Sequence, residues 1–293
     1  MDKTPIIFFG TEDFSAISLQ KLIDDGFNIV GIITKPDSKK GRGQKLHAPE
    51  VKKTGEKYEI PVLQPQKMNE IIEFVKSFDS PAGVLVSFGR IIPQNIIDLF
   101  TPGIINVHPS LLPKYRGPSP IESAILNGES KTGVSIMQLS AKMDAGPVYV
   151  QEEISLSQIE TATDLYETSG KIGARLLSSH LSGILNEIIT PKPQKESEAI
   201  YCQLLSKSDS ILNPKTTSAE QAERQVRAYE IFPKTKIKIN ESLCIINKAE
   251  VVSVKSNQLD IKFKGEKYLK IKKLTAPNGK QMSADSFING YLK

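Results

Sequence analysis

Residues 5–34 read PIIFFGTEDFSAISLQKLIDDGFNIVGIIT. Two apolar runs, 5–9 and 27–34, enclose a segment at 14–22 whose apolar residues recur at helical spacing. A strand, a helix and a second strand within about 30 residues form a βαβ unit, which joins two parallel strands. The beginning of the chain therefore predicts an α/β fold built on a parallel sheet.

The alternation of strand-like and helix-like segments continues to about residue 190. An unusually long connection at 35–58 follows the second strand, and connections of that length are usually functional or disordered. We therefore expect one large α/β domain with an inserted segment. Its further strands are expected at 61–63, 82–87, 104–107, 133–139 and 148–156, and its further helices at 68–78, 93–100, 119–126 and 161–188.

A polar, proline-rich segment at 191–197, PKPQKES, is typical of a linker. Beyond it the pattern predicts one helix and then five short strands within about 90 residues, which indicate a small barrel or sandwich. A basic five-stranded barrel is typical of an OB-fold; the alternative is a small β-module that only packs on the main domain. The helix is expected at 219–229 and the strands at 235–239, 243–246, 250–254, 258–263 and 269–273.

The composition excludes several classes of protein. The chain has 293 residues, 39% hydrophobic and 24% charged, so it is neither too polar nor too short to bury a large core. No apolar run reaches the roughly 18 residues that a membrane-spanning helix needs, and the N-terminus lacks the features of a signal peptide. Two cysteines, Cys202 and Cys244, are too few for a disulfide framework. We therefore expect a cytoplasmic protein with no membrane association.

The positive charge is concentrated in two places. Residues 200–293 contain 17 Lys and Arg against 9 Asp and Glu, a net charge of +8, whereas residues 1–199 have a net charge of −3. A second basic stretch, 35–57, holds 8 basic and 3 acidic residues. A solvated charged face is the ordinary explanation for one such run. Two separate runs in an otherwise mildly acidic chain make a nucleic-acid partner an equal alternative.

Polar residues that suit a reaction gather at the end of one expected strand. Asn106 and His108 are two residues apart, so on a strand they project from the same face. A proline ends the strand, and residues 110–113 must turn away as a loop with several free backbone groups. A later turn, MDAGP at 143–147, exposes Asp144. Ligands in open α/β sheets bind outside the carboxyl ends of strands, so we expect a site here.

These side chains suit acyl transfer to an amine. Asn106 and His108 can donate hydrogen bonds to the oxyanion that develops when an amine attacks a carbonyl carbon, and His108 or Asp144 can handle the departing proton. The substrate amine is itself the nucleophile, and the chain has no Gly-x-Ser-x-Gly motif. Three histidines are unfavourable for a His-rich metal site, and Gly10-Thr11 is a weak phosphate-loop signal, so we expect neither a metal nor a dinucleotide. A structural role for the Asn-x-His pair stays open.

Several motifs resemble the 10-formyltetrahydrofolate-dependent formyltransferases. Those shared by several members of that family are NVH at 106–108, SLLP at 110–113, YRG at 115–117, and Asp144 downstream of TGV at 132–134. The similarity runs from about residue 5 to the C-terminus and is weaker after about residue 190. Further motifs resemble the members of the family that act on methionyl-tRNA. They are FFGT at 8–11 with Phe14, TKPD at 34–37, GRG at 41–43, SFGRIIP at 87–93, GVSIM at 133–137 and LSK at 205–207.

The resemblance implies a fold, a reaction and a set of site residues. The fold is a Rossmann-like formyl-transfer domain at 1–190, a linker at 191–202 and an OB-like domain at 203–293 that contacts tRNA. The reaction is transfer of a formyl group from 10-formyltetrahydrofolate to the α-amino group of initiator methionyl-tRNA, by a monomer without a metal. Catalysis is then expected from Asn106, His108 and Asp144, folate binding from Ser110, Leu111, Leu112, Pro113, Phe88, Gly89 and Arg90, and contact with methionyl-tRNA from Phe14, Arg42, Lys39, Lys40 and Lys45.

Departures from the family pattern concern the acceptor more than the chemistry. The chain has no tryptophan, although relatives often carry one near the start of the C-terminal domain, and that domain is compact. The alternative is a formyltransferase that acts on a nucleotide-sugar amine, which would need neither the basic insertion nor the basic C-terminal domain. A non-catalytic folate- or RNA-binding protein is disfavoured because Asn106, His108 and Asp144 occur together.

Overall fold

The computed structural model describes residues 3–40, 44–240 and 242–292. The chain forms two compact units. Two short segments before residue 190 group with the C-terminal part, and residues 191–202 group with the first unit. The limits 1–190, 191–202 and 203–293 stay a prediction. The first unit comprises Met1–Pro118, Thr132–Ile154 and Tyr166–Cys202; the second comprises Ser119–Lys131, Ser155–Leu165 and Gln203–Lys293.

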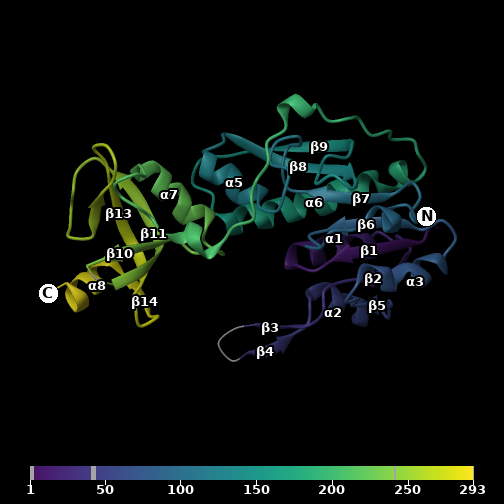
Figure 1. Cartoon of the computed structure of the whole chain (residues 1–293), viewed down its shortest axis with the longest axis horizontal. Helices are drawn as coiled ribbons and strands as arrows, with labels where there is room; N and C mark the ends of the chain where they lie inside the picture. The colour runs from purple at the N-terminus through teal and green to yellow at the C-terminus, as the bar shows by residue number, and fades with distance from the viewer. Residues whose placement is uncertain (1–2, 41–43, 241, 293) are drawn as a thin grey trace. The chain divides into compact units, whose positions relative to one another are not determined.

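The first unit is built on a sheet with the strand order β5-β2-β1-β6-β7-β8-β9 (Figure 1). Every pair from β5 to β7 is parallel, and β8 runs antiparallel to β7. The predicted mostly parallel, Rossmann-like sheet is therefore confirmed. Its strands are β1 (Ile6–Gly10), β2 (Ile29–Ile33), β5 (Val62–Leu63), β6 (Ala82–Val86), β7 (Ile104–His108), β8 (Lys131–Gln138) and β9 (Val148–Ser155).

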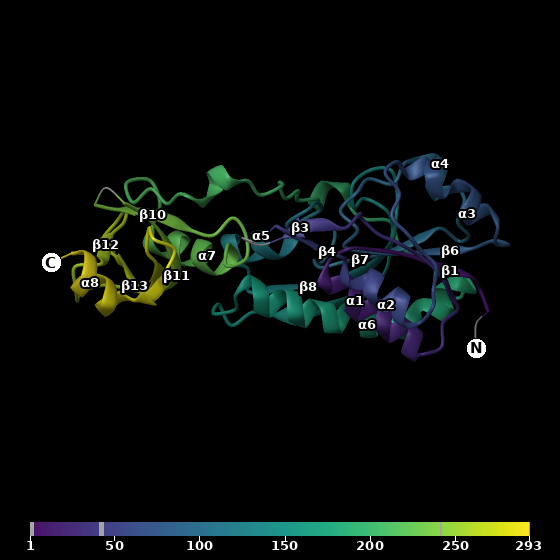
Figure 2. The same cartoon turned by 90° about the horizontal axis from the view of Figure 1, so that it is seen from below.

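Alternate strand residues enter two apolar layers, one on each face of this sheet. Ile6 and Phe8 of β1 pack in the layer formed with α1, α2 and α6, whereas Ile7 and Phe9 pack in the layer formed with α3 and α4. Figure 2 shows these helices on opposite sides of the strands. The helices are α1 (Asp13–Asp24), α2 (Glu50–Lys57), α3 (Ile72–Lys76), α4 (Gln94–Ile97) and α6 (Ala162–Leu185), and a 3-10 helix, Met68–Ile71, precedes α3.

The longest of these helices, α6, approaches β7 closely. A methyl group added at Gly173 would come within 2.8 Å of the Val107 side chain, so only glycine permits this approach. Leu177 and Leu181 continue the apolar face of α6 one and two turns later. Helix α6 therefore packs closely against the strand that carries the polar residues of the expected site. Across the described ranges, no helix combines the length and the apolar character needed to cross a membrane.

The basic insertion contains structure that the sequence did not predict. Strands β3 (Ser38–Lys40) and β4 (Lys45–His47) pair antiparallel, and α2 follows them. The Lys39 and Lys45 side chains are exposed on these strands. Polar, three-residue strands carry almost no alternation of hydrophobicity, which explains why the pattern did not reveal them.

The second unit contains an antiparallel sheet with the order β10-β11-β13-β12, and β14 pairs with β13. This sheet is consistent with the predicted OB-like domain. The predicted strands 243–246 and 250–254 are wrong as separate elements, because they form one strand, β11, and β14 and the last helix were not predicted. The elements are α5 (Pro120–Asn127), α7 (Ala219–Ala228), β10 (Lys236–Ile239), β11 (Ser242–Val252), β12 (Asp260–Lys262), β13 (Tyr268–Thr275), β14 (Gln281–Ser283) and α8 (Ala284–Tyr291).

Candidate active site

Strand β7 carries Asn106 and His108 to the carboxyl edge of the parallel sheet. It lies between β6 and β8, with Leu85 opposite Asn106 on one side and Ser135 opposite His108 on the other. Both residues are 5% exposed, and their side chains project from the face opposite to Val107, which packs toward α6. Buried polar groups at the end of a central strand need partners, and the loop at 115–117 supplies one for His108.

The imidazole of His108 is oriented by a backbone carbonyl. His108 Nε2 lies 2.9 Å from the carbonyl oxygen of Tyr115. A carbonyl oxygen only accepts hydrogen bonds, so Nε2 must be the protonated nitrogen that donates to it. His108 Nδ1 is then left facing Asp144, whose Oδ2 lies 3.7 Å away. Nδ1 is therefore the nitrogen available to exchange a proton, with a carboxylate beside it.

Asp144 is held in an uncommon backbone conformation. Its φ of +47° lies in the left-handed region, which a residue other than glycine adopts only with support from its surroundings. Asp144 Oδ2 accepts a hydrogen bond of 2.8 Å from the backbone N–H of Gly117. Gly117 itself has a φ of +120°, and a methyl group there would lie 2.6 Å from the carbonyl oxygen of Cys202. The loops at 115–117 and 143–147 are thus joined at the carboxylate.

The turn at 110–113 is tied to the sheet rather than left free. Ser135 Oγ donates to the carbonyl oxygen of Ser110 and accepts from the backbone N–H of Leu112. Gln151 Nε2 donates to the carbonyl oxygen of Leu112 and to Ser135 Oγ. The expectation of several free backbone groups in this turn is therefore wrong for these atoms. Leu112 is buried, so what the turn presents to a ligand is chiefly its shape and the second lone pairs of its carbonyl oxygens.

The segment 88–90, which also follows a central strand, presents backbone to the sheet edge. The Phe88 ring is fully buried and packs edge-on against Phe9, and the Arg90 guanidinium donates to the carbonyl oxygens of Pro65 and Gln66. Gly89 has a φ of +65°. Neither large side chain is presented to a ligand, so a folate contact from this segment would use the backbone around Gly89.

The residues expected to contact the acceptor lie in different settings. Phe14 is 7% exposed and its ring packs edge-on against Tyr166, so it belongs to the apolar core of the first unit. Lys39 and Lys45 lie on the exposed β3–β4 hairpin, and the backbone of Lys40 pairs with that of Lys45. Arg42 lies outside the described residues.

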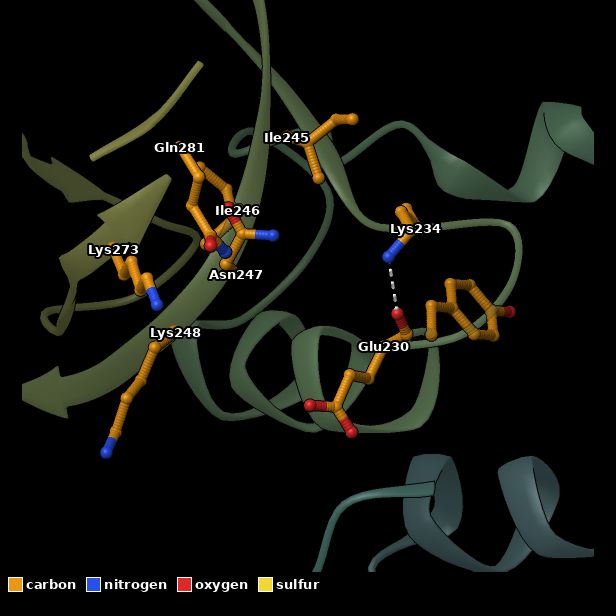
Figure 3. Close-up of a pocket in the computed structure, with 9 residues that line it drawn as sticks. Glu230, Lys234, Ile245, Ile246, Asn247, Lys248, Lys273 and Gln281 are labelled. Atoms are coloured by element: carbon orange, nitrogen blue, oxygen red, sulfur yellow. Dashed lines mark hydrogen bonds between the residues drawn. The ribbon is translucent and has the colours of Figure 1, made fainter. Parts of the chain in front are cut away.

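The second unit carries a basic cavity of about 300 Å³ beside β11 and β13 (Figure 3). Lys248 and Lys273 line it and lie opposite each other in the strand register, at a bulge in β11. Like charges directly opposite on a sheet repel each other, and an anion between them removes the repulsion. Among the described residues neither lysine forms an ion pair, whereas Lys270 and Lys272 on the same strand both approach Glu250. Lys234, Asn247 and Gln281 add further polar groups to the cavity wall, which also contains Glu230, so three lysines stand against one glutamate.

Sequence reasoning quoted Ser135 and Arg116 only within family motifs and gave neither residue a supporting role. Ser135 lies opposite His108 in the strand register, and that pairing depends on a chain reversal that local pattern does not reveal. Arg116 is fully buried, although an arginine in a loop is normally read as exposed. Within the described ranges, no group of three or more His, Cys, Asp and Glu side chains is arranged to hold a metal ion.

The chain is similar to known proteins along nearly its whole length. The formyl transferase family model matches residues 3–181, and the model of the formyl transferase C-terminal domain matches residues 204–292. The methionyl-tRNA formyltransferase of Sulfurihydrogenibium sp. (strain YO3AOP1) is 35% identical over 98% of this chain and 96% of that protein. The methionyl-tRNA formyltransferase of Thermodesulfovibrio yellowstonii is 38% identical over 97% of this chain and 95% of that protein.

Solved structures share the fold at lower identity. An N-formyltransferase from Helicobacter canadensis, in complex with folinic acid and dTDP-3-aminofucose, has a TM-score of 0.70 at 19% identity and covers 92% of this chain and 99% of its own. HypX from Aquifex aeolicus, in complex with tetrahydrofolic acid, has a TM-score of 0.63 at 16% identity and covers 100% of this chain and 48% of its own. These likenesses show the fold alone, whereas the family models and the full-length relatives show more. The chain belongs to the formyl transferase family, in the group that includes the methionyl-tRNA formyltransferases.

Proposed function

We propose that this protein transfers the formyl group of 10-formyltetrahydrofolate to the α-amino group of methionyl-tRNA. The amine nitrogen forms a bond to the formyl carbon, and the bond between that carbon and N10 of the folate breaks. The proton lost by the amine goes to N10, so the products are formylmethionyl-tRNA and tetrahydrofolate. The observation that carries the proposal is the His108–Asp144 pair at the carboxyl edge of the sheet, in a chain similar to methionyl-tRNA formyltransferases over nearly its full length.

Three side chains would perform the chemistry. Asn106 shares one face of β7 with His108, and its amide N–H groups would stabilise the negative charge that develops on the formyl oxygen. His108 Nδ1 would relay the proton of the attacking amine, because Nε2 is committed to the carbonyl oxygen of Tyr115. Asp144 would orient the amine and stabilise a positive charge on the imidazole. An α-amino group has a pKa of about 7.7 to 8.0, so a large share of it is already neutral near pH 7.5 and little further activation is needed.

The folate would bind beside the turn at 110–113 and the segment 88–90. Both follow central strands, β7 and β6, at the edge where ligands of open α/β sheets bind. The turn is rigid because Ser135 and Gln151 hold its backbone, so it would offer a preformed surface to a flat heterocycle. A preformed surface lowers the ordering cost of binding.

The tRNA would be held by charge outside the catalytic edge. The exposed lysines of the β3–β4 hairpin and the Lys248–Lys273 cavity are two separate basic surfaces, and phosphate groups are the polyanionic ligands that such surfaces favour. Arg42 belongs to the same basic stretch of sequence as the hairpin. We also propose that the protein acts on initiator methionyl-tRNA as a cytoplasmic monomer.

A side-by-side acceptor assay tests the function. The purified protein is given 10-formyltetrahydrofolate labelled in the formyl group, together with methionyl-tRNA or a nucleotide-linked amino sugar at equal concentrations. We expect label in methionyl-tRNA, at a rate about 10²-fold lower with the Asp144→Asn variant. Label in the amino sugar at a higher kcat/KM than in methionyl-tRNA would replace this proposal with the sugar-amine alternative.

A further inference from the structure

The segment expected to be a linker is attached to the catalytic loops. Residues 191–202, here called the strap, are bound at their start by two hydrogen bonds of 2.8 Å between the backbones of Lys192 and Val148. At its end, the carbonyl oxygen of Ile200 accepts from the backbone N–H of Arg116, and the backbone N–H of Cys202 donates to the carbonyl oxygen of Arg116. The strap therefore begins beside the Asp144 turn and ends beside the loop that carries Tyr115 and Gly117.

One strap side chain, Gln194, joins these two loops. Gln194 Nε2 donates to the carbonyl oxygens of Asp144 and Gly146, at 2.8 and 2.7 Å. Its Oε1 accepts a hydrogen bond of 3.0 Å from Arg116 Nε. The next residue, Gly117, donates its backbone N–H to Asp144 Oδ2. A closed ring of hydrogen bonds therefore includes the Asp144 carboxylate and runs through Asp144, Gln194, Arg116 and Gly117.

Arg116 anchors this ring in the protein interior. Its side chain is fully buried and donates to Glu196 Oε2 at 2.8 Å and to the Tyr201 hydroxyl at 2.9 Å, both on the strap. Burial by itself would lower the pKa of Arg116, but the hydrogen bonds with Glu196 and Tyr201 outweigh it and raise that pKa, so the guanidinium stays charged. Glu196 also pairs with Lys142, which lies just before the Asp144 turn. The strap is therefore bound to both loops by two of its side chains, Gln194 and Glu196.

The ring has a specific consequence for Asp144. The left-handed φ of Asp144 is an uncommon conformation, so the orientation of its peptide groups depends on the hydrogen bonds that they form. Gln194 binds the carbonyl oxygen of Asp144 and that of Gly146, two residues later in the turn. We propose that Gln194 is a positioning residue for formyl transfer, which sets the distance between the Asp144 carboxylate and His108 Nδ1. A misplacement of about 1 Å in such a group lowers a rate by up to about 10²-fold. This inference rests on the proposed function for its kinetic test.

The variant Gln194→Glu separates positioning from attachment. The carboxylate keeps an acceptor for Arg116 but has no N–H groups for the two carbonyl oxygens of the turn, and its second oxygen repels them. We expect kcat for formyl transfer to fall about tenfold, with KM for either substrate and the thermal midpoint nearly unchanged. The control is Ser197→Ala, an exposed strap residue three positions along the chain, which should match wild type.

A double-mutant cycle with Asp144→Asn decides whether Gln194 acts through Asp144. Once Asp144 has lost its charge, Gln194→Glu should change kcat by less than about twofold. An equal loss in both backgrounds overturns the proposal, as does a wild-type kcat for the single variant. If the thermal midpoint of Gln194→Glu falls, the neutral, length-matched Gln194→Met is put through the same cycle at a lower temperature, with the same two outcomes counting against the proposal.

Hydrogen–deuterium exchange tests the strap without any substrate. The amide of Gly117, which binds the Asp144 carboxylate, should exchange faster in Gln194→Glu than in wild type or Ser197→Ala. If wild type does not formylate methionyl-tRNA but this difference in exchange is seen, the proposed function is wrong, and the inference that Gln194 positions Asp144 is kept. If wild type is active and the exchange rates are equal, the proposal for Gln194 fails alone.

Discussion

The carboxyl end of β7 and the cavity beside β11 place polar groups in opposite ways. At β7 the polar side chains are buried and each loop around them is bound by hydrogen bonds from at least two directions. In the second unit Lys248 and Lys273 are exposed, lie opposite each other and have no acidic partner among the described residues. A transferred formyl group requires positions correct to a fraction of an ångström, whereas a phosphate backbone requires charge within reach. The end of β7 therefore suits the transfer reaction, and the cavity beside β11 suits the binding of a polyanion.

The largest effect should come from the buried pair. His108→Ala and Asp144→Asn should each lower kcat by about 10²-fold or more, since each removes a group that stabilises charge or moves a proton in the transition state. The measurement is steady-state formylation of methionyl-tRNA with purified, folded variants. His180→Gln is the matched control, because the imidazole of His180 on α6 contacts the backbone of its own helix at Leu176. Turnover close to wild type in either active-site variant would remove that residue from the mechanism.

The next largest effect should come from the opposed lysines. Replacement of both Lys248 and Lys273 by glutamine should lower kcat/KM for methionyl-tRNA about tenfold and reduce the slope of log(kcat/KM) against log salt by about 2, while kcat stays near wild type. The control is Lys270→Gln/Lys272→Gln, which removes the same charge from lysines that approach Glu250. Equal effects of the two pairs would mean that the net charge of the unit matters and the cavity does not.

A smaller effect is expected in the basic insertion. Arg42→Ala should lower the formylation rate a few-fold at low methionyl-tRNA concentration and leave folate binding unchanged, because one phosphate contact is lost. Added salt should narrow the gap between the variant and wild type. The comparison protein is Lys53→Gln, whose lysine is paired with Glu50 in α2. A rate equal to wild type at low salt would leave the insertion a charged surface without a role in tRNA binding.

The smallest effect concerns an ion pair of the second unit. A hydrogen bond from Lys267 lowers the pKa of Glu220 from its usual 4.5 to about 2. Because the folded-state pKa is the lower one, the stabilisation is complete above about pH 4.5 and is lost as the pH falls toward 2. Both side chains are about half exposed, so Lys267→Gln should lower the free energy of unfolding by about 0.2–1 kcal/mol at neutral pH. Urea unfolding at a series of pH values should show this difference shrinking below about pH 4.5; a constant difference would contradict it.

The positions of the proposed catalytic residues in the fold could be predicted because short-range rules apply to them. Asn106 and His108 follow from the alternation of a strand, and the turn that carries Asp144 follows from its Gly-Pro pair. Whether Asp144 lies close to His108 depends on the order of the strands in the sheet, which local pattern does not give. The resemblance to a family supplied that expectation.

The misses share a physical cause: they depend on contacts between residues far apart in the chain. The burial of Phe14 and Phe88 is set in the same way, by the layers packed around their rings, and their assignment to substrate contact stays a prediction. The segment at 247–249 reads as a break, whereas pairing with β13 across a bulge carries β11 straight through it. Gln194 lies 50 residues from Asp144, and its role depends on the strap returning to the sheet. Residues 119–131 and 155–165 group with the C-terminal part, so point variants test the second unit more cleanly than a deletion does.

The central claim is that the buried site carries out formyl transfer and the exposed lysines bind the tRNA. A salt titration of the wild-type enzyme tests it most directly. Initial rates are measured over a range of methionyl-tRNA concentrations at saturating 10-formyltetrahydrofolate, from about 50 to about 200 mM salt. We predict that kcat/KM for methionyl-tRNA falls steeply with salt while kcat stays constant, since exposed lysines govern binding and the buried site governs the chemical step. A kcat that falls in parallel with kcat/KM, or a kcat/KM that does not respond to salt, would contradict the account.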